Sequence, residues 1–199
     1  MLVKRLFDII CSIFGLVILL PFFCIIAILI KSTSRGSVFF RQNRVGLYGK
    51  IFAIHKFRTM VTNAETLGPK ITIGLDKRVT KIGYLLRKTK LDELPQLIDV
   101  LYGTMSLVGP RPEVPEYVDL YPQEDKDIIF SVRPGITDWA SIKMIDENEI
   151  LAKSDNPRQI YIQEIMPQKI AFAVKYVKGR SFIEDIIIIF TTFIKIIRR

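Results

Sequence analysis

Cysteine, histidine and tryptophan are scarce in this 199-residue sequence, which has two, one and one of them. Both cysteines, Cys11 and Cys24, lie in an apolar N-terminal stretch. A helix would separate them by about 20 Å at ~1.5 Å per residue, which is too far for a disulfide. The sequence therefore suggests neither a disulfide framework nor a zinc site. It also lacks a glycine-aromatic RNP run and zinc-finger spacing, so we expect no nucleic-acid partner.

Charge and hydrophobicity are both high. Hydrophobic residues make up 49% of the chain, and 29 Lys and Arg against 20 Asp and Glu give a net charge of +9. The length suits one domain with an appendage. The combination favours contact with a membrane surface or a phosphate-rich partner.

Charged residues are absent from residues 9–30, a run long enough to cross a hydrocarbon core, which needs about 20 apolar residues. Pro21, inside the run, removes a helical hydrogen bond and kinks or breaks a helix. Basic residues flank both ends of the run: Lys4, Arg5, Lys31 and Arg35. Because positive flanks favour the cytoplasmic side, we predict that residues 1–35 form a re-entrant hairpin with its break at Pro21. A straight span with snorkelling lysines is the alternative, and the missing small-x-small site disfavours a cleaved signal peptide.

Two short β-prone runs, residues 38–40 and 51–54, flank Gly46 and Gly49 and predict a β-hairpin. Continued through Arg58, the second strand places four side chains on one face: Phe52, Ile54, Lys56 and Arg58. The two cations are candidates for holding a diphosphate, and a solvated strand edge is the alternative. His55 points to the opposite face in this scheme, and we assign it no role.

Two adjacent carboxylates, Asp92 and Glu93, begin a run with helical apolar spacing. The apolar members are Leu91, Leu94, Leu97, Ile98 and Leu101. Thr89 is the expected N-cap, and Pro95 is tolerated in the first turn. The positive end of the helix would then favour ionised carboxylates and a bound phosphate. The alternative is that acidic residues are simply common at helix starts.

Cations flank this pair on both sides in the sequence. Six cationic residues precede it: Lys77, Arg78, Lys81, Arg87, Lys88 and Lys90. We expect Arg87 to point toward the pair while others face anionic headgroups, with a solvated basic face as the alternative. After the pair, Pro110 and Pro112 bracket Arg111, which a rigid loop would present to a phosphate. A turn with an incidental arginine is the alternative.

The C-terminal region is expected to be helical from about Gln168, with a break at Gly179 and a short helix earlier at residues 123–130. Residues 182–197 are mostly apolar and end in Arg198 and Arg199. This length is short for a span, so an interfacial helix lying on the membrane is predicted. A helix packed in the core is the competing interpretation.

Four motifs in this order resemble those of the bacterial sugar transferase family, the monotopic phosphoglycosyl transferases. They are KFRTM at 56–60, LDELPQ at 91–96, MSLVGPRPE at 105–113 and VRPGIT at 132–137. The resemblance covers nearly the whole chain and implies the minimal catalytic form. It implies an α+β monotopic membrane protein, with the re-entrant hairpin at 1–35 and a compact cytoplasmic catalytic domain at 36–199. A small β-hairpin and interfacial helices would complete the fold, at the cytoplasmic face of the bacterial inner membrane.

The resemblance also implies the activity: transfer of a phosphosugar from a UDP-sugar to polyprenyl (undecaprenyl) phosphate, with release of UMP, as the first membrane step of glycan assembly. Asp92 would be the nucleophile of an aspartyl-phosphosugar intermediate, and Glu93 would bind Mg²⁺. Substrate binding is assigned to seven residues: Lys56, Arg58, Arg87, Pro110, Arg111, Pro112 and Arg133. UDP-sugar, polyprenyl phosphate and membrane lipids are the expected partners, and a homodimer is left open.

Five positions depart from the family pattern: Lys90 (serine), Asp99 (asparagine), Thr104 (aspartate), Asp138 (glycine) and Ala173 (aspartate). They leave the sugar and part of the metal or substrate shell open, and an N-acetylated amino sugar is the expectation from the family. Two alternative functions remain at this point. One is a non-catalytic membrane-bound scaffold of a glycan-assembly complex, and the other is a UDP-sugar hydrolase.

Overall fold

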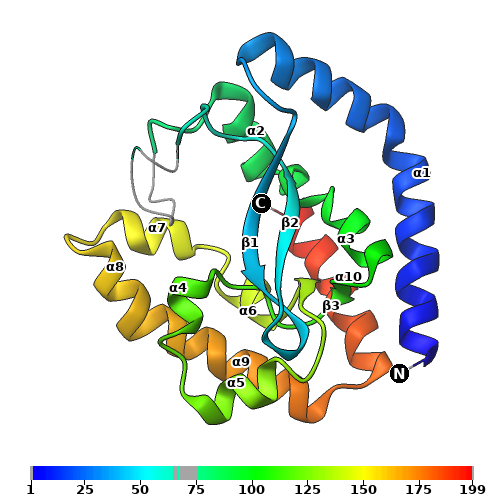
Figure 1. The fold of residues 1–199 in the computed structure, drawn as a ribbon, viewed down its shortest axis with the longest axis vertical. Coiled ribbons are helices and arrows are strands. Elements are labelled where there is room, and N and C mark those ends of the chain that lie inside the picture. Colours follow the sequence, from blue (N-terminus) through cyan, green and yellow to red (C-terminus); the bar gives the residue numbers. More distant parts are fainter. Residues whose placement is uncertain (1, 65–66, 68–75, 199) are drawn as a thin grey trace.

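The protein combines many helices with two small sheets, as a computed structural model of residues 2–64, 67 and 76–198 shows (Figure 1). In chain order the elements are α1 (Leu2–Thr33), β1 (Phe39–Val45), η1 (Leu47–Gly49), β2 (Ile51–Phe57), α2 (Lys81–Lys88), η2 (Leu91–Glu93), α3 (Gln96–Tyr102), β3 (Ser106–Val108), α4 (Pro115–Val118), α5 (Gln123–Ile129), β4 (Gly135–Thr137), α6 (Trp139–Lys143), α7 (Glu147–Ala152), α8 (Pro157–Ile160), η3 (Tyr161–Ile165), α9 (Met166–Gly179) and α10 (Phe182–Ile197). The predicted α+β class is confirmed.

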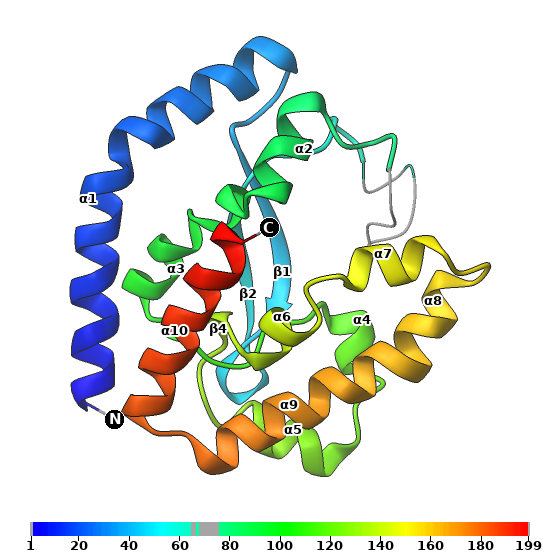
Figure 2. The same ribbon diagram turned by 180° about the vertical axis from the view of Figure 1, so that it is seen from behind.

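The N-terminal helix α1 runs along one side of the molecule and bends partway along its length (Figures 1 and 2). Pro21 lies inside it, yet the helix is continuous over 32 residues. The predicted helix–break–helix is therefore wrong in one respect: the chain bends without leaving the helical conformation. A proline removes one backbone hydrogen bond, and a kink is enough to accommodate its ring.

One narrow side of α1 is buried and the rest is exposed and apolar. Asp8, Ser12, Ile26 and Ile30 are its buried residues. Ile26 and Ile30 pack against Phe57 of β2, among other residues. Exposed positions include Phe14 at 67%, Val17 at 67% and Ile28 at 68%. In the described part of the chain, α1 is the one helix long and apolar enough to cross a membrane by length and composition.

The central β-hairpin pairs β1 with β2 in antiparallel register, from Phe39 opposite Phe57 to Val45 opposite Ile51 (Figure 1). The connecting turn η1 contains Tyr48, whose φ is 56°. The hairpin prediction is confirmed, although β2 ends at Phe57, one residue short of Arg58. Strand β2 contacts both α3 and η2, so the hairpin lies beside the segment that carries the acidic pair.

A second sheet joins β3 to β4 in parallel, with Ser106 opposite Gly135 and Val108 opposite Thr137. A β-carbon added to Gly135 would lie 2.1 Å from the backbone nitrogen of Gly109, so only glycine permits this approach. The predicted turn at 132–137 therefore ends in a strand. This contact fixes where the loop after β3, which carries Arg111, leaves the sheet.

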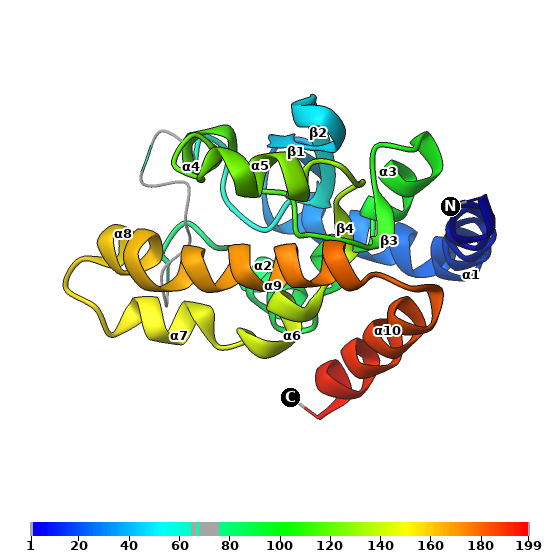
Figure 3. The same cartoon turned by 90° about the horizontal axis from the view of Figure 1, so that it is seen from below.

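The C-terminal helices α9 and α10 lie at a steep angle to each other, and Arg180 and Ser181, just after Gly179, separate them (Figure 3). Ile188 of α10 is fully buried against Tyr176 and Val177 of α9. The opposite side of α10 is apolar and exposed, with Ile183 at 73% and Phe193 at 62%. The helices predicted at 123–130 and 182–197 are confirmed.

Candidate active site

The segment before the acidic pair folds differently from the prediction. Thr80 caps the start of α2 by accepting a hydrogen bond from the backbone nitrogen of Gly83 at 2.9 Å. Thr89 closes that helix, donating from its hydroxyl to the carbonyl of Leu85 at 2.8 Å. Lys90 then adopts a left-handed conformation with φ 59°, and η2 begins after it. Thr89 as an N-cap is therefore wrong, because its hydroxyl is used to end the preceding helix.

The carboxylates, rather than the predicted leucines, form much of the buried side of this segment. Asp92 and Glu93 are 7% and 8% exposed. Among the predicted apolar positions only Leu97 is buried, and the others are half-buried. Leu97 lies close to Gly15 of α1, where an added β-carbon would be 3.2 Å from it. The segment therefore turns apolar residues toward α1 and the acidic pair toward the interior.

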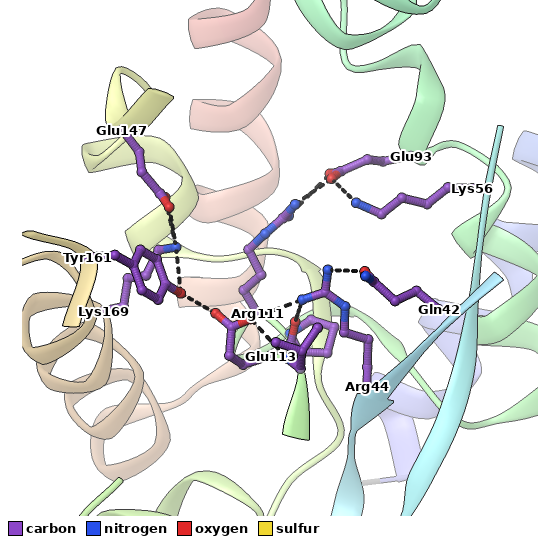
Figure 4. Close-up of polar contacts among 11 residues, drawn as sticks. Gln42, Arg44, Lys56, Glu93, Arg111, Glu113, Glu147, Tyr161 and Lys169 are labelled. Atoms are coloured by element: carbon purple, nitrogen blue, oxygen red, sulfur yellow. Dashed lines mark hydrogen bonds and ion pairs between the residues drawn. The ribbon is translucent and has the colours of Figure 1, made fainter. Parts of the chain in front are cut away.

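Two cations converge on Glu93 (Figure 4). The Lys56 ammonium on β2 donates to Glu93 Oε1 at 2.7 Å. The Arg111 guanidinium donates to both oxygens, with a separation of 3.2 Å from Nη1 to Oε2. Burial opposes ionisation of Glu93, but the charges of Arg111 and Lys56 outweigh it and hold the pKa of Glu93 well below its usual range. Glu93 is thus a fixed anion.

Asp92, the neighbouring carboxylate, is left without these partners. Its Oδ1 is buried and has no hydrogen-bond partner among the described residues. Burial, followed by the negative charge of Glu93, raises the pKa of Asp92. The expected effect of a helix N-terminus is therefore overcome, because desolvation and a like charge both disfavour the ionised form. The pair divides into one saturated anion and one poorly solvated carboxylate.

Asp138, the N-cap of α6, accepts a hydrogen bond from the backbone of the loop that carries Arg111. Asp138 Oδ1 accepts from the backbone nitrogen of Ser141 at 2.7 Å, and Oδ2 accepts from that of Arg111 at 3.2 Å. The prolines Pro110 and Pro112 restrict the backbone on both sides. Glu93 raises the pKa of Arg111 further above its ordinary value. The predicted rigid arginine loop is present, and its guanidinium is directed at Glu93.

A second polar network, not predicted from sequence, supports the next residue of this loop (Figure 4). Glu113 Oε1 accepts from Arg44 of β1 at 3.1 Å, and Oε2 accepts from the Tyr161 hydroxyl. Lys169 of α9 approaches the Tyr161 hydroxyl at 3.5 Å and pairs with Glu147 at 2.7 Å. These contacts connect the β-hairpin, the loop and α9. No local sequence pattern predicts these contacts, because the residues that make them are far apart in the chain.

A small pocket adjoins the arginine loop, and neither Asp92 nor Glu93 is among its lining residues. Its wall combines the polar side chains Arg111, Glu113, Asp138 and Lys169 with the apolar side chains Tyr121, Ile129, Phe130, Ile170 and Ala173, and with Pro110 and Ala140. Asp138 and Ala173, two of the departures from the family pattern, both line it. The pocket and the acidic pair thus share Arg111.

Three further predicted substrate-binding residues occupy different places. Arg87 Nε donates to Thr59 Oγ1 at 2.8 Å, and the charge of Asp92 acts on Arg87. Arg58 donates to Ser34 and Arg35 at the end of α1, with Nη2 2.9 Å from the Ser34 carbonyl. Arg133 is exposed and donates to the Gly103 carbonyl at 2.7 Å. Arg87 therefore lies near the acidic pair, whereas Arg58 and Arg133 donate hydrogen bonds to backbone carbonyls at the ends of α1 and α3.

His55, for which the sequence predicts no role, contacts Asp99 of α3. Asp99 Oδ2 accepts from the His55 backbone nitrogen at 2.8 Å, and Oδ1 lies 2.7 Å from Nδ1. Nε2 of the same ring lies 2.7 Å from Arg41 of β1. Consecutive residues of β2, His55 and Lys56, therefore hold α3 and η2 in place. The departure at Asp99 supplies this contact.

The donor set of Glu93 does not fit a preformed magnesium site. Both of its oxygens already accept hydrogen bonds from cations. Over residues 2–64, 67 and 76–198, no group of three or more His, Cys, Asp or Glu side chains is placed to hold a metal ion. Mg²⁺ is usually held by one or two carboxylates together with water and substrate phosphates. Glu93 as a metal ligand stays a prediction.

Comparison with known proteins gives a family match over the whole chain: the model described as bacterial sugar transferase covers residues 1–199. A UDP-N-acetylgalactosamine-undecaprenyl-phosphate N-acetylgalactosaminephosphotransferase from Aeromonas hydrophila is 38% identical over 192 residues, covering 96% of this chain and 42% of the relative. A UDP-glucose:undecaprenyl-phosphate glucose-1-phosphate transferase from Escherichia coli (strain K12) is 39% identical over 198 residues, covering 98% and 40%. The exopolysaccharide production protein PSS from Rhizobium leguminosarum bv. phaseoli is 35% identical over 207 residues, covering 100% and 97%. The chain thus spans less than half of the first two relatives and nearly all of the third.

Proposed function

The chain belongs to the bacterial sugar transferase family, and on that basis we propose that it transfers a phosphosugar from a UDP-sugar to undecaprenyl phosphate, releasing UMP. The observation that carries this proposal is the contrast between Glu93, saturated by Lys56 and Arg111, and Asp92, whose buried Oδ1 has no partner in the described chain. A carboxylate that is not neutralised by a salt bridge keeps its electron pairs available for attack.

Asp92 is the nucleophile in this proposal. A carboxylate oxygen of Asp92 attacks the β-phosphorus of the UDP-sugar, and an oxygen–phosphorus bond forms. The bond from that phosphorus to the oxygen shared with the α-phosphate breaks, and UMP leaves with the electron pair. In the second step a phosphate oxygen of undecaprenyl phosphate attacks the same phosphorus, and the Asp92 carboxylate leaves. No redox reaction is involved, and the two bulky anions never need to meet at once.

The cations around the pair let an anionic substrate approach two carboxylates. Lys56 and Arg111 neutralise Glu93, so the diphosphate meets the negative charge of Asp92 alone. Arg87, oriented by Thr59, adds positive charge near Asp92. Positioned charges of this kind stabilise developing negative charge in a partly buried site. We also propose, on the family resemblance, that the Pro110–Arg111–Pro112 loop contacts the nucleotide.

We also propose magnesium as the cofactor, on the family resemblance. When bound, the ion would neutralise phosphate charge. Because both oxygens of Glu93 are engaged, the ion would reach this carboxylate only after Lys56 or Arg111 moves. The two steps above describe only what the side chains of this chain do, and the ion would add to the charge that they supply.

The membrane placement of the site is a further part of the proposal. The exposed apolar side chains of α1 and α10 fit the hydrocarbon and interfacial regions of a bilayer. We propose the cytoplasmic face of the bacterial inner membrane, with α1 entering and leaving the same leaflet. Single cysteines at Val3 and Ser32, in a background with Cys11→Ala and Cys24→Ala, test this topology. Labelling from the same face of sealed vesicles supports it, and labelling from opposite faces contradicts it.

The activity is tested by incubating the detergent-purified protein with a panel of UDP-sugars and Mg²⁺, with and without undecaprenyl phosphate. We expect UMP release of about one equivalent per enzyme without lipid, a phosphosugar adduct on Asp92, and sustained turnover when lipid is added. No UMP and no adduct with any sugar would favour a scaffold. Sustained turnover without lipid would favour a UDP-sugar hydrolase. The panel includes N-acetylated amino sugars, the expected class.

A further inference from the structure

Gln96, in the first turn of α3, is a buried polar residue to which the proposed mechanism gives no task. Its side chain is 1% exposed. Its amide nitrogen Nε2 is buried and has no hydrogen-bond partner within the described ranges. Leaving a buried donor unpaired is unfavourable, so such groups are usually paired by protein, water or a ligand.

The position of Gln96 is defined by its neighbours along the helical segment. Asp92, Gln96 and Asp99 follow one another at intervals of four and three residues, which places them on one side of a helix. All three are buried. Asp99 contacts His55 of β2, and Glu93, next to Asp92, contacts Lys56 of β2. Gln96 thus lies on the side facing β2, between those two contacts.

The direction of the side chain relates Gln96 to Asp92. Side chains on a helix lean toward its N-terminus and cover the preceding turn. Leu94 and Pro95 both have helical backbone angles, so the helical path is unbroken between η2 and α3. The Gln96 carboxamide therefore covers the turn that carries Asp92.

The two unpaired atoms are chemically complementary to one ligand. Asp92 Oδ1 is an acceptor and Gln96 Nε2 is a donor, and neither is bonded to the other. A phosphoryl group offers a partner to each atom: its electrophilic phosphorus suits the Asp92 carboxylate, and its anionic oxygens suit the Gln96 amide. Lys56 and Arg111 are already engaged by Glu93, so Gln96 supplies a donor that does not compete with that ion pair.

We propose that Gln96 is a substrate-contacting catalytic residue, whose Nε2 donates a hydrogen bond to a non-bridging oxygen of the phosphoryl group that Asp92 attacks. The inference rests on the proposed function and adds a residue to it. When the oxygen–phosphorus bond to Asp92 forms and the bond to UMP breaks, the amide keeps its contact to the same phosphoryl oxygen. It holds that group again when the lipid phosphate attacks and Asp92 leaves. A neutral donor suits this role, because it cannot neutralise Asp92.

The test compares Gln96→Met, which keeps length and removes the donor, with Gln96→Glu, which replaces the donor by an acceptor. The exposed Gln163→Met is the matched control. UMP burst rate, steady-state turnover and melting temperature are measured for each protein. We expect Gln96→Met to slow the burst by about tenfold or more at an unchanged or raised melting temperature, and Gln96→Glu to slow it further. The melting temperature is informative because the ligand-free protein loses no hydrogen bond in Gln96→Met.

Two results would overturn the proposal: a wild-type burst rate in Gln96→Met, or a loss of rate accompanied by a comparable loss of stability, which would assign Gln96 to packing. Failure of the underlying function is seen separately, because it would leave the wild-type protein without a UMP burst. A normal wild-type burst that is lost in Asp92→Asn and unchanged in Gln96→Met would retain the transferase and reject the role of Gln96.

Discussion

Lys56 on β2 and Glu93 on η2 are joined by a 2.7 Å ion pair that fastens the β-hairpin to the segment carrying Asp92. Both side chains are largely buried, at 18% and 11% exposure. The pair determines which way the backbone of η2 faces. Asp92 consequently lies beside an anion that is neutralised by other residues, and its own carboxylate is left for chemistry.

Replacing the proposed nucleophile should remove activity without loss of stability. Asp92→Asn keeps the shape of the side chain and removes a carboxylate whose ionisation burial disfavours. We expect the UMP burst to fall at least a thousandfold, taking ~4 kcal/mol as lost transition-state stabilisation, while the melting temperature is unchanged or higher. Burst kinetics and thermal denaturation check this, with the exposed Asp119→Asn as control. Residual burst activity near that of the control would contradict the assignment.

Breaking the ion pair should cost stability. Lys56→Met leaves Glu93 with Arg111 alone, and we expect a loss of about 2 kcal/mol in the free energy of unfolding. The loss in Lys56→Met/Glu93→Gln should be smaller than the sum of the two single losses, because each single change already removes the contact between Lys56 and Glu93. Urea denaturation of the two single variants and the double variant measures the coupling energy. Strictly additive losses would show that the two residues do not act together.

The pH dependence should follow the raised pKa of Asp92. The nucleophile must be ionised, so the burst rate should fall on acidification at a higher pH than an ordinary aspartate, of pKa about 3.9, would give. Glu93→Gln removes the neighbouring negative charge and should move this fall to lower pH. The pKa of Asp92 is higher in the folded state than in the unfolded state, so protonated Asp92 favours folding. This contribution to stability is fully present below the unfolded-state pKa of ~3.9, and it is lost as pH rises through the folded-state pKa. Burst rates and urea midpoints across the pH range check both signs, and an unmoved profile in Glu93→Gln would count against the coupling.

The network behind the arginine loop should affect binding more than chemistry. Tyr161→Phe leaves Glu113 Oε2 without the hydroxyl that donates to it, which should cost about 1–2 kcal/mol of stability. A less firmly held loop should raise the KM for the UDP-sugar and change kcat little. Steady-state kinetics with Tyr48→Phe as the exposed control separate these effects. A fall in kcat at constant KM would place the network in the chemical step instead.

Removal of magnesium tests the cofactor. After dialysis against a chelator, we expect the burst to be lost and to return on addition of Mg²⁺, with protein folding unchanged by circular dichroism. A full burst in chelator would show that the side-chain cations alone suffice. Lys56→Met should alter the magnesium concentration that gives half-maximal rate, because it removes one of the two cations that contact Glu93.

The elements that sequence predicted well are those specified by neighbouring residues. The helix at 182–197 has a capping serine, Ser181, with Glu184 and Asp185 in its first turn and an apolar run at 186–190, and these features act locally. The β-hairpin is likewise marked by glycines between two β-prone runs. The arginine loop follows from two prolines that restrict the backbone whatever surrounds them. These parts needed no knowledge of distant contacts.

The remaining features depend on residues far apart in the chain. Thr89 and Thr80 are both plausible caps, and only the hydrogen bond of Thr80 to Gly83 decides which one starts a helix. The contact of His55 with Asp99 spans 44 residues, and no periodicity indicates it. The strands β3 and β4 have three residues each, too few to give an alternating pattern. An inward-facing carboxylate such as Glu93 runs against the apolar pattern and is favoured only once Lys56 and Arg111 are in place.

The position of Lys4 has a practical consequence for truncated proteins. Its ammonium donates to the Val108 carbonyl at 2.9 Å, to Tyr176 at 3.0 Å and to Asp185 of α10. The first and last helices therefore share one partly buried charge pair beside the strand that leads to the arginine loop. A soluble fragment made by deleting residues 1–35 would leave Asp185 uncompensated, and trimming α10 would do the same to Lys4. We therefore expect the active protein to need both ends of the chain.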